Sequence, residues 1–99
     1  MPTTYLQVIA HYFCRPGEEP VVKALLTELA RETRNEPMNI SYEFFQSTEN
    51  PQHIVILEKY TEARGLEVHR DTAHFQNIGV KQIIPLLEER KVESYMVSV

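Results

Sequence analysis

Apolar and polar residues follow two different periods in the first third of the chain. Residues 4–15 are rich in aromatic and β-branched side chains and stop at Pro16-Gly17, which predicts a strand ended by a turn. Helical spacing then relates four apolar residues, Val22, Leu25, Leu26 and Leu29. With acidic residues near its start and basic residues near its end, this segment predicts an amphipathic helix that closes at Pro37.

Two further strands are indicated in the middle of the chain. Residues 39–47 and 53–60 are dominated by apolar and β-branched side chains. Residues 49–52, between them, have the composition of a turn. The pattern therefore predicts a hairpin.

The second half is helical until its last segment. Residues 61–70 fit a short helix with Thr61 as its N-cap. Residues 71–90 fit another helix, whose apolar stripe consists of Val80, Ile83, Ile84 and Leu87. Pro85 should kink or split it, because proline lacks the amide hydrogen and disfavours helical backbone at the residue before it. Residues 91–99 alternate and predict a fourth strand.

The order β-α-β-β-α-β, with a divided second helical region, predicts a ferredoxin-like α+β fold in one domain spanning residues 1–99. Helices cover only one face of such a sheet. However, residues 5–13 are mostly apolar at even and odd positions alike, and Phe44 and Phe45 should point to opposite faces. We therefore expect a homodimer through the open sheet face, because a large exposed apolar patch is unusual for a monomer. A small apolar pocket is also expected.

Composition narrows the function classes. The 99 residues carry a net charge of −4 with no basic stripe, which argues against nucleic acid as a partner. A single cysteine, Cys14, excludes an internal disulfide and suits a reducing compartment. There is no apolar run of about 18 residues and no basic-then-apolar start. We therefore expect a cytoplasmic protein with no membrane partner.

Two of the four histidines, His69 and His74, lie five positions apart. Five helical residues rotate a side chain by about 140°, so the two imidazoles should not share a face. Since no cysteine or second carboxylate stands at ligand spacing, no metal site is predicted. Asp71 and Thr72 can cap the following helix, whose positive end would favour neutral imidazole at His74. Neutral imidazole can accept a proton, so His74 is a candidate general base. A histidine that only bonds the backbone near the cap is the commoner role.

Other side chains are less specific candidates for a functional site. His11 could line a pocket or simply be a satisfied strand histidine, and His53 should be solvated. Glu58 stands in a buried strand and needs a partner, for which an arginine or a histidine is expected, since Lys59 points to the other face. The aromatic residues should mostly fill the core or a dimer interface, with a minority stacking on a ligand: Tyr42, Phe44, Phe45, Tyr60 and Phe75.

Three stretches together resemble a known family: residues 8–37, 41–75 and 92–97. Their cues are Pro-Gly after the first strand, Arg-Asn-Glu-Pro at the end of the first helix and Ser-Tyr-Glu opening the second strand. Five single residues complete the set, namely Glu58, Tyr60, Ala63, His69 and His74. The chain resembles the antibiotic biosynthesis monooxygenase (ABM) domain proteins, including small quinol monooxygenases, over nearly its whole length.

The resemblance implies a dimeric α+β barrel that oxidises a small aromatic or quinol with molecular oxygen and needs no cofactor. In that chemistry the protein deprotonates an electron-rich phenol, and the resulting anion passes an electron to oxygen. His74 and His69 become the catalytic candidates, and Glu58 would orient one of them. The expected substrate-binding set is Tyr60, Phe75, Tyr42, Phe44 and His11.

Some positions depart from the family pattern. Many members have tryptophan where this chain has Tyr60, and glycine where it has Met38. The haem-degrading branch uses a strand-one asparagine, a strand-three tryptophan and a helix histidine bound to iron. Here Gln7 is the nearest polar residue in the first strand, and the chain has no tryptophan. Haem binding or degradation is therefore a second expectation, and a non-catalytic dimeric ligand-binding or stress-response module is a third.

Overall fold

The first strand divides its side chains strictly between two faces. The computed structural model describes residues 3–99, so Met1 and Pro2 of the predicted domain lie outside the described residues. Even-numbered residues from Leu6 to Cys14 are buried, and the odd-numbered ones between them are half-buried. The elements are β1 (Thr4–Cys14), α1 (Glu19–Thr33), β2 (Asn39–Gln46), β3 (His53–Tyr60), α2 (Gly65–Arg70), η1 (Phe75–Ile83), η2 (Ile84–Leu86) and β4 (Leu87–Ser98).

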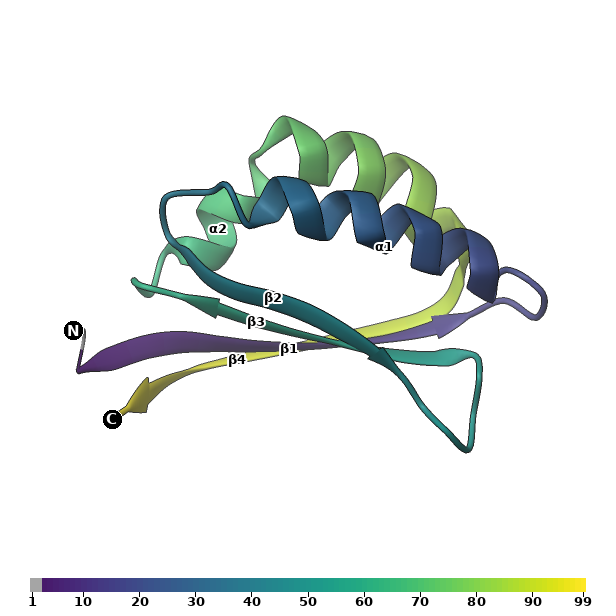
Figure 1. Cartoon of the computed structure of the whole chain (residues 1–99), viewed down its shortest axis with the longest axis horizontal. Helices are drawn as coiled ribbons and strands as arrows, with labels where there is room; N and C mark the ends of the chain where they lie inside the picture. The colour runs from purple at the N-terminus through teal and green to yellow at the C-terminus, as the bar shows by residue number, and fades with distance from the viewer. Residues whose placement is uncertain (1–2) are drawn as a thin grey trace.

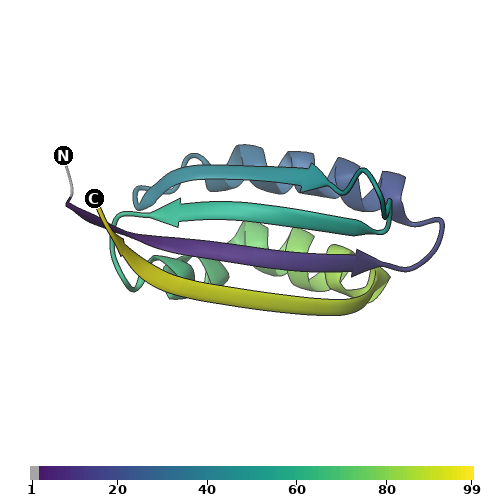
Figure 2. The same cartoon turned by 90° about the horizontal axis from the view of Figure 1, so that it is seen from below.

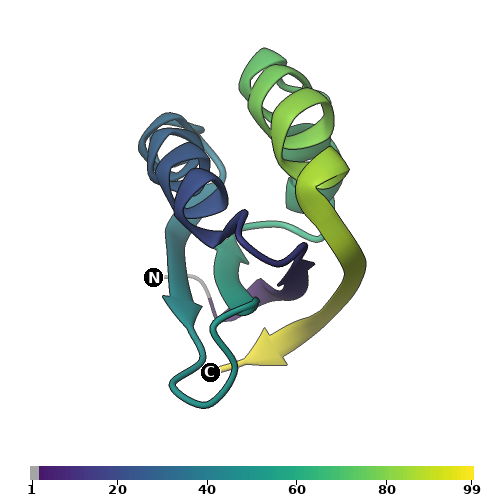
Figure 3. The ribbon, with the colours of Figure 1, turned by 90° about the vertical axis from the view of Figure 1, so that its right-hand side faces the viewer.

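The strands form one four-stranded antiparallel sheet in the order β2-β3-β1-β4. All the helices lie on one face of this sheet, and the other face is open (Figures 1 and 2). Figure 3 shows α1 and the longer helix of the second half as two separate rods above the sheet. The predicted ferredoxin-like α+β fold is confirmed.

The core lies between the helices and the sheet. Branched and aromatic side chains from the inner face of each element pack there, because the alternation of β1 and β3 directs every second residue to the face that the helices cover. The largest cluster consists of Ala10, Tyr12, Cys14, Val22, Leu26, Leu29, Ala30, Tyr42, Ile54, Ile56, Ile83 and Leu87. Within residues 3–99, no helix is long and apolar enough to cross a membrane.

The short helix α2 begins later than predicted. Its N-terminal flanking residue is Arg64, so the assignment of Thr61 as N-cap was wrong. The reason is a close approach: a Cβ on Gly65 would lie 2.3 Å from Cβ of Tyr60. Residues 61–64 therefore form a turn that returns the chain over the end of β3 before the helix starts.

The next helix differs from the predicted one in its period. Its residues Phe75–Ile83 form a π-helix, in which hydrogen bonds run from i to i+5, and its buried residues are Phe75, Gly79 and Ile83. The predicted stripe was wrong apart from Ile83, because it assumed the α-helical period: Val80 is exposed, and Leu87 belongs to a strand.

The predicted break at Pro85 is confirmed. A 3₁₀ turn, Ile84–Leu86, follows the π-helix, and the backbone becomes extended at Leu87. Strand β4 begins there rather than at residue 91, because Leu87 already pairs with Cys14 across a register shift in β1.

Candidate functional site

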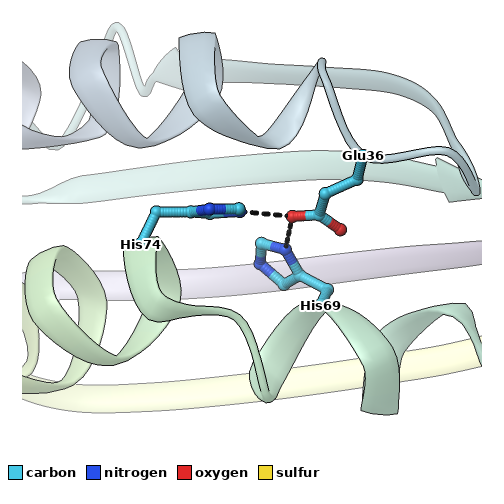
Figure 4. Close-up of side chains that lie close together, drawn as sticks. All are labelled: Glu36, His69 and His74. Atoms are coloured by element: carbon cyan, nitrogen blue, oxygen red, sulfur yellow. Dashed lines mark hydrogen bonds and ion pairs between the residues drawn. The ribbon is translucent and has the colours of Figure 1, made fainter.

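One carboxylate joins the two histidines of the second half. Glu36, in the loop after α1, accepts a hydrogen bond at Oε2 from Nδ1 of His69 at 2.7 Å. The same oxygen accepts a second hydrogen bond from Nε2 of His74 at 2.6 Å. Figure 4 shows the three side chains converging from three separate segments. The side chains of Glu36, His69 and His74 are 7%, 2% and 19% exposed, so the cluster is largely withdrawn from water.

The break between α2 and the π-helix brings the imidazoles together. The Thr72 hydroxyl donates to the carbonyl of His69 at 2.7 Å and accepts from the amide of Phe75 at 3.2 Å. The Thr72 hydroxyl therefore bonds the first turn of the next helix, which begins with residues 73 and 74, as predicted, whereas Asp71 flanks the C-terminus of α2 instead. The expectation that His69 and His74 point apart was wrong, because the rotation argument holds only within one continuous helix.

A second carboxylate lies on the other side of His69. Glu58 accepts a hydrogen bond from the Tyr60 hydroxyl at 2.6 Å, and its Oε1 lies 3.9 Å from Nε2 of His69. Glu58 and Tyr60 stand two residues apart on β3 and so share the face that the helices cover. The predicted histidine partner of Glu58 is confirmed, although the tyrosine hydroxyl is closer.

The pKa values of the carboxyl groups of Glu36 and Glu58 are shifted in opposite directions. Burial tends to raise the pKa of Glu36, but the hydrogen bonds from His69 and His74 outweigh it and hold the pKa below its ordinary value. Burial raises the pKa of Glu58, and the charge of His69 and the Tyr60 hydroxyl offset only part of this. Burial and the neighbouring Glu58 raise the pKa of Tyr60 far above the ordinary range, so its hydroxyl stays a donor.

The hydrogen bonds also define which nitrogen carries the proton. An ionised carboxylate can only accept, so His69 donates from Nδ1 and His74 donates from Nε2. In a neutral His74, the lone pair is then on Nδ1. An imidazole oriented by a carboxylate in this way can take a proton from a substrate, and the carboxylate stabilises the resulting charge.

Aromatic rings enclose His69. The centroids of Tyr42, Tyr60 and Phe75 lie 6.0, 5.8 and 5.0 Å from that of the imidazole. All three rings are buried, and Phe44 is half-buried against the core, which confirms their predicted filling role. Their stacking on a ligand stays a prediction.

His11 does not belong to this cluster. It stands at an odd position of β1, on the open face, where its Nδ1 lies 2.9 Å from Nε2 of His53. The ring of His53 also stacks on Phe13, with centroids 4.5 Å apart. His11 therefore cannot share a pocket with His69 and His74 of the same chain, because the sheet separates them. The expectation that His53 is merely solvated was also wrong.

A surface hollow lies away from all of these residues. Its volume is about 360 Å³, and its lining belongs to α1: Pro20, Val21, Ala24, Leu25 and Glu28. None of the candidate residues lines it, and its position on one helix offers no converging polar groups of the kind that orient a substrate. A substrate pocket beside His74 therefore stays a prediction.

Glu36 was missed as a site residue. It stands 33 residues from His69 and 38 from His74, so no local spacing connects them. The available signal is the segment Arg34-Asn35-Glu36-Pro37, one of the cues of the family resemblance. The donor atoms of Glu36, His69 and His74 lie within 4.8 Å of one another, close enough to share a metal ion.

Comparison with known proteins assigns the chain to a family. The sequence model of the family "Antibiotic biosynthesis monooxygenase" (ABM) matches residues 6–79, and the chain belongs to this family. Rv0793 of Mycobacterium tuberculosis, named as a candidate monooxygenase, is 31% identical over 75 residues, which are 76% of this chain and 73% of Rv0793.

Solved structures resemble the whole chain. A crystal structure of an antibiotic biosynthesis monooxygenase is 29% identical with a TM-score of 0.82, covering 95% of this chain and 97% of the other. Protein PA3566 from Pseudomonas aeruginosa has a TM-score of 0.88 at 22% identity, covering 100% and 99%. At that identity, PA3566 shows a shared fold only.

Proposed function

We propose that the chain is a monooxygenase that oxidises a small phenol or quinol with molecular oxygen and needs no metal or organic cofactor. One observation carries this proposal: the imidazole of His74 is oriented by the carboxylate of Glu36, whose side chain is 7% exposed and whose other partner, His69, is enclosed by aromatic rings. Membership in the ABM family and the similarity to Rv0793 support the class of reaction.

His74 has the role of general base in this proposal. Its Nδ1 takes the phenolic proton while its Nε2–H stays bonded to Glu36, so the positive charge forms next to a negative one. The phenolate passes an electron to oxygen, and the two radicals combine at ring carbon. Loss of water then gives a quinone, so that phenol and O₂ become quinone and H₂O with all electrons supplied by the substrate.

His69 and Glu58 act as positioning residues. His69 donates to the same oxygen of Glu36 and so restricts the carboxylate to one orientation. Glu58, held by Tyr60, lies at the far edge of the His69 ring. The order Tyr60, Glu58, His69, Glu36, His74 therefore connects a core strand to the proposed base.

Oxygen uptake by chelator-treated protein tests the proposal. We expect uptake above the uncatalysed rate with some member of a panel of phenols and quinols. His74→Ala should reduce the rate by about 10²–10⁴-fold, the usual contribution of a general base. Val21→Ala, at an exposed position of α1 away from the histidine cluster and from the open face, is the control and should keep the rate. Absence of uptake across the panel, or equal rates for His74→Ala and wild type, would overturn the proposal.

A non-catalytic ligand-binding module is the second candidate. It is favoured by the hydrogen bonding of the histidine cluster, in which both imidazoles already donate to Glu36. This candidate predicts that some phenols raise the melting temperature without any oxygen uptake. Turnover would eliminate it.

The same proposal includes a homodimer through the open sheet face. Phe45 and Tyr95 on this face are 52% and 50% exposed, and Ile9 and Leu57 pair side by side at its centre. Size-exclusion chromatography with light scattering should give twice the mass of the chain. Leu57→Glu should produce monomers, whereas Val21→Glu, at the hollow on α1, should leave the dimer intact. A monomeric wild-type protein would exclude this part of the proposal.

A further inference from the structure

We infer that Glu36, His69 and His74 form a binding site for one divalent transition-metal ion of the Zn²⁺ or Co²⁺ type. Their donor atoms lie within 4.8 Å of one another, although they come from the loop after α1, from α2 and from the start of the next helix. Convergence of three ligand side chains from distant segments on one point is the arrangement that a metal site requires.

The donor set selects the class of ion. Two imidazole nitrogens and one carboxylate oxygen suit the borderline ions Zn²⁺, Co²⁺, Ni²⁺ and Fe²⁺, whereas Mg²⁺ and Ca²⁺ prefer oxygen ligands throughout. Ligand atoms about 2.0–2.2 Å from a common ion lie roughly 3 Å or more from each other. The present distances from Glu36 Oε2, 2.7 Å to His69 and 2.6 Å to His74, would therefore have to widen by several tenths of an ångström.

The surroundings of His69 provide an independent argument. When Nδ1 of this imidazole binds a metal, its hydrogen must be on Nε2, and that nitrogen faces Oε1 of Glu58 at 3.9 Å. Metal-bound histidines commonly donate their other N–H to a carboxylate. Glu58 is itself held by the Tyr60 hydroxyl at 2.6 Å. The structure thus contains both the ligands and the second layer that orients one of them.

The two buried carboxyl groups near His69 also favour a bound cation. Glu36 and Glu58 are two carboxyl groups on either side of one buried imidazole, and Glu58 is only 5% exposed. Burying two negative charges this close is unfavourable unless cationic charge compensates them. A divalent ion between Glu36 and the histidines would balance both. Three protein ligands also leave a position for water or an anion, and His74 is the most exposed of the three at 19%.

Metal binding would also affect the proposed reaction, and this part of the inference rests on the proposed function. A metal at Nε2 of His74 would displace the hydrogen to Nδ1, because a neutral imidazole carries only one. His74 could then no longer take a substrate proton. The ion would therefore inhibit a reaction that depends on His74 as a base, and its removal would restore the rate.

Calorimetric titration of the chelator-treated chain with Zn²⁺ tests the site, and the visible absorption of bound Co²⁺ reports its geometry. We expect one ion per chain. His69→Ala and Glu36→Gln should abolish stoichiometric binding, and Glu58→Gln should weaken it by about 10–100-fold. The double variant His11→Ala/His53→Ala is the matched control, since it removes the other histidine pair, and it should bind as wild type.

Three results would overturn the inference: no saturable binding, unchanged binding by His69→Ala, or binding lost only in the His11/His53 variant. Circular dichroism checks that each variant is folded. If His69→Ala does not fold, His74→Ala, at the more exposed ligand, replaces it. Because calorimetry needs no substrate, a failed metal titration and a failed oxygen assay are separate outcomes.

Discussion

The protein contains two histidine pairs on opposite faces of one sheet, and they are built differently. His69 and His74 do not bond to each other but donate to one oxygen of Glu36 under the helices. His11 and His53 bond directly to each other on the open face, with their ring nitrogens 2.9 Å apart.

The two pairs differ because only the pair under the helices shares a carboxylate, Glu36. In the direct pair one imidazole must accept, so at least one ring has to be neutral for the bond to exist. In the pair joined by Glu36 both rings donate, and either can carry a positive charge beside the carboxylate. The first arrangement suits a half-exposed surface, whereas the second allows His69 to be buried and His74 to change protonation during a reaction.

Replacing Glu36, the carboxylate that both imidazoles share, should cause the largest loss of stability. Glu36→Gln keeps the size of the side chain but removes the charge that both imidazoles contact. We expect a loss of about 2–4 kcal/mol in the free energy of unfolding, because hydrogen bonds to a buried charged group are lost. Urea denaturation measures this. His11→Ala on the other face should cost less than about 1 kcal/mol, and equal losses would show that the two pairs do not differ as argued.

The close contact between Gly65 and Tyr60, next to the cluster, should be the next most sensitive to substitution. A Cβ at Gly65 would lie 2.3 Å from the Tyr60 Cβ, which cannot move without moving β3. Gly65→Ala should therefore cost about 1–3 kcal/mol by overpacking. Gly79→Ala is the matched control, since its Cβ would meet the Phe75 ring at 3.3 Å. A loss at Gly79 as large as that at Gly65 would contradict this account of why α2 starts there.

Tyr60→Phe removes a single hydroxyl from the buried face. Because that hydroxyl donates to Glu58 at 2.6 Å, its loss should cost about 1–2 kcal/mol and raise the pKa of Glu58 further. Thermal unfolding at several pH values measures both effects. Tyr95→Phe, at a half-exposed ring of the open face, should leave stability unchanged. If the pKa of Glu58 were unchanged in Tyr60→Phe, the hydroxyl would not stabilise the charged form of Glu58.

The pH dependence of stability should show the smallest effect, with opposite signs for the two carboxyls. The pKa of Glu36 is lowered on folding, so its contribution is present above the ordinary value of 4.5 and is lost as pH falls through the folded pKa. The pKa of Glu58 is raised, so its contribution is present below 4.5 and is lost as pH rises through the folded pKa. Glu36→Gln should flatten the acid side of the stability curve, and Glu58→Gln the side above 4.5. Identical curves for the two variants would contradict the opposite shifts.

Sequence patterns predicted most of the fold because strands and helices have local periods. The alternation in β1, the hairpin of β2 and β3, the helix α1 and the break at Pro85 all follow from neighbouring residues. The one false period, the stripe through Val80, arose where the chain forms a π-helix. Nothing in a short window distinguishes a π-helix from an α-helix, and a periodic apolar pattern predicts the α-helical period because π-helices are rare.

The sequence by itself determined which side chains are available: His69 and His74, the buried-strand pair Glu58 and Tyr60, and a Thr72 cap between two helices. Only the tertiary structure decided that Glu36 joins the two histidines and that His11 lies across the sheet from them. The physical reason is distance along the chain. Packing of the loop after α1 against α2 brings together residues 33 positions apart, and no local pattern encodes that contact.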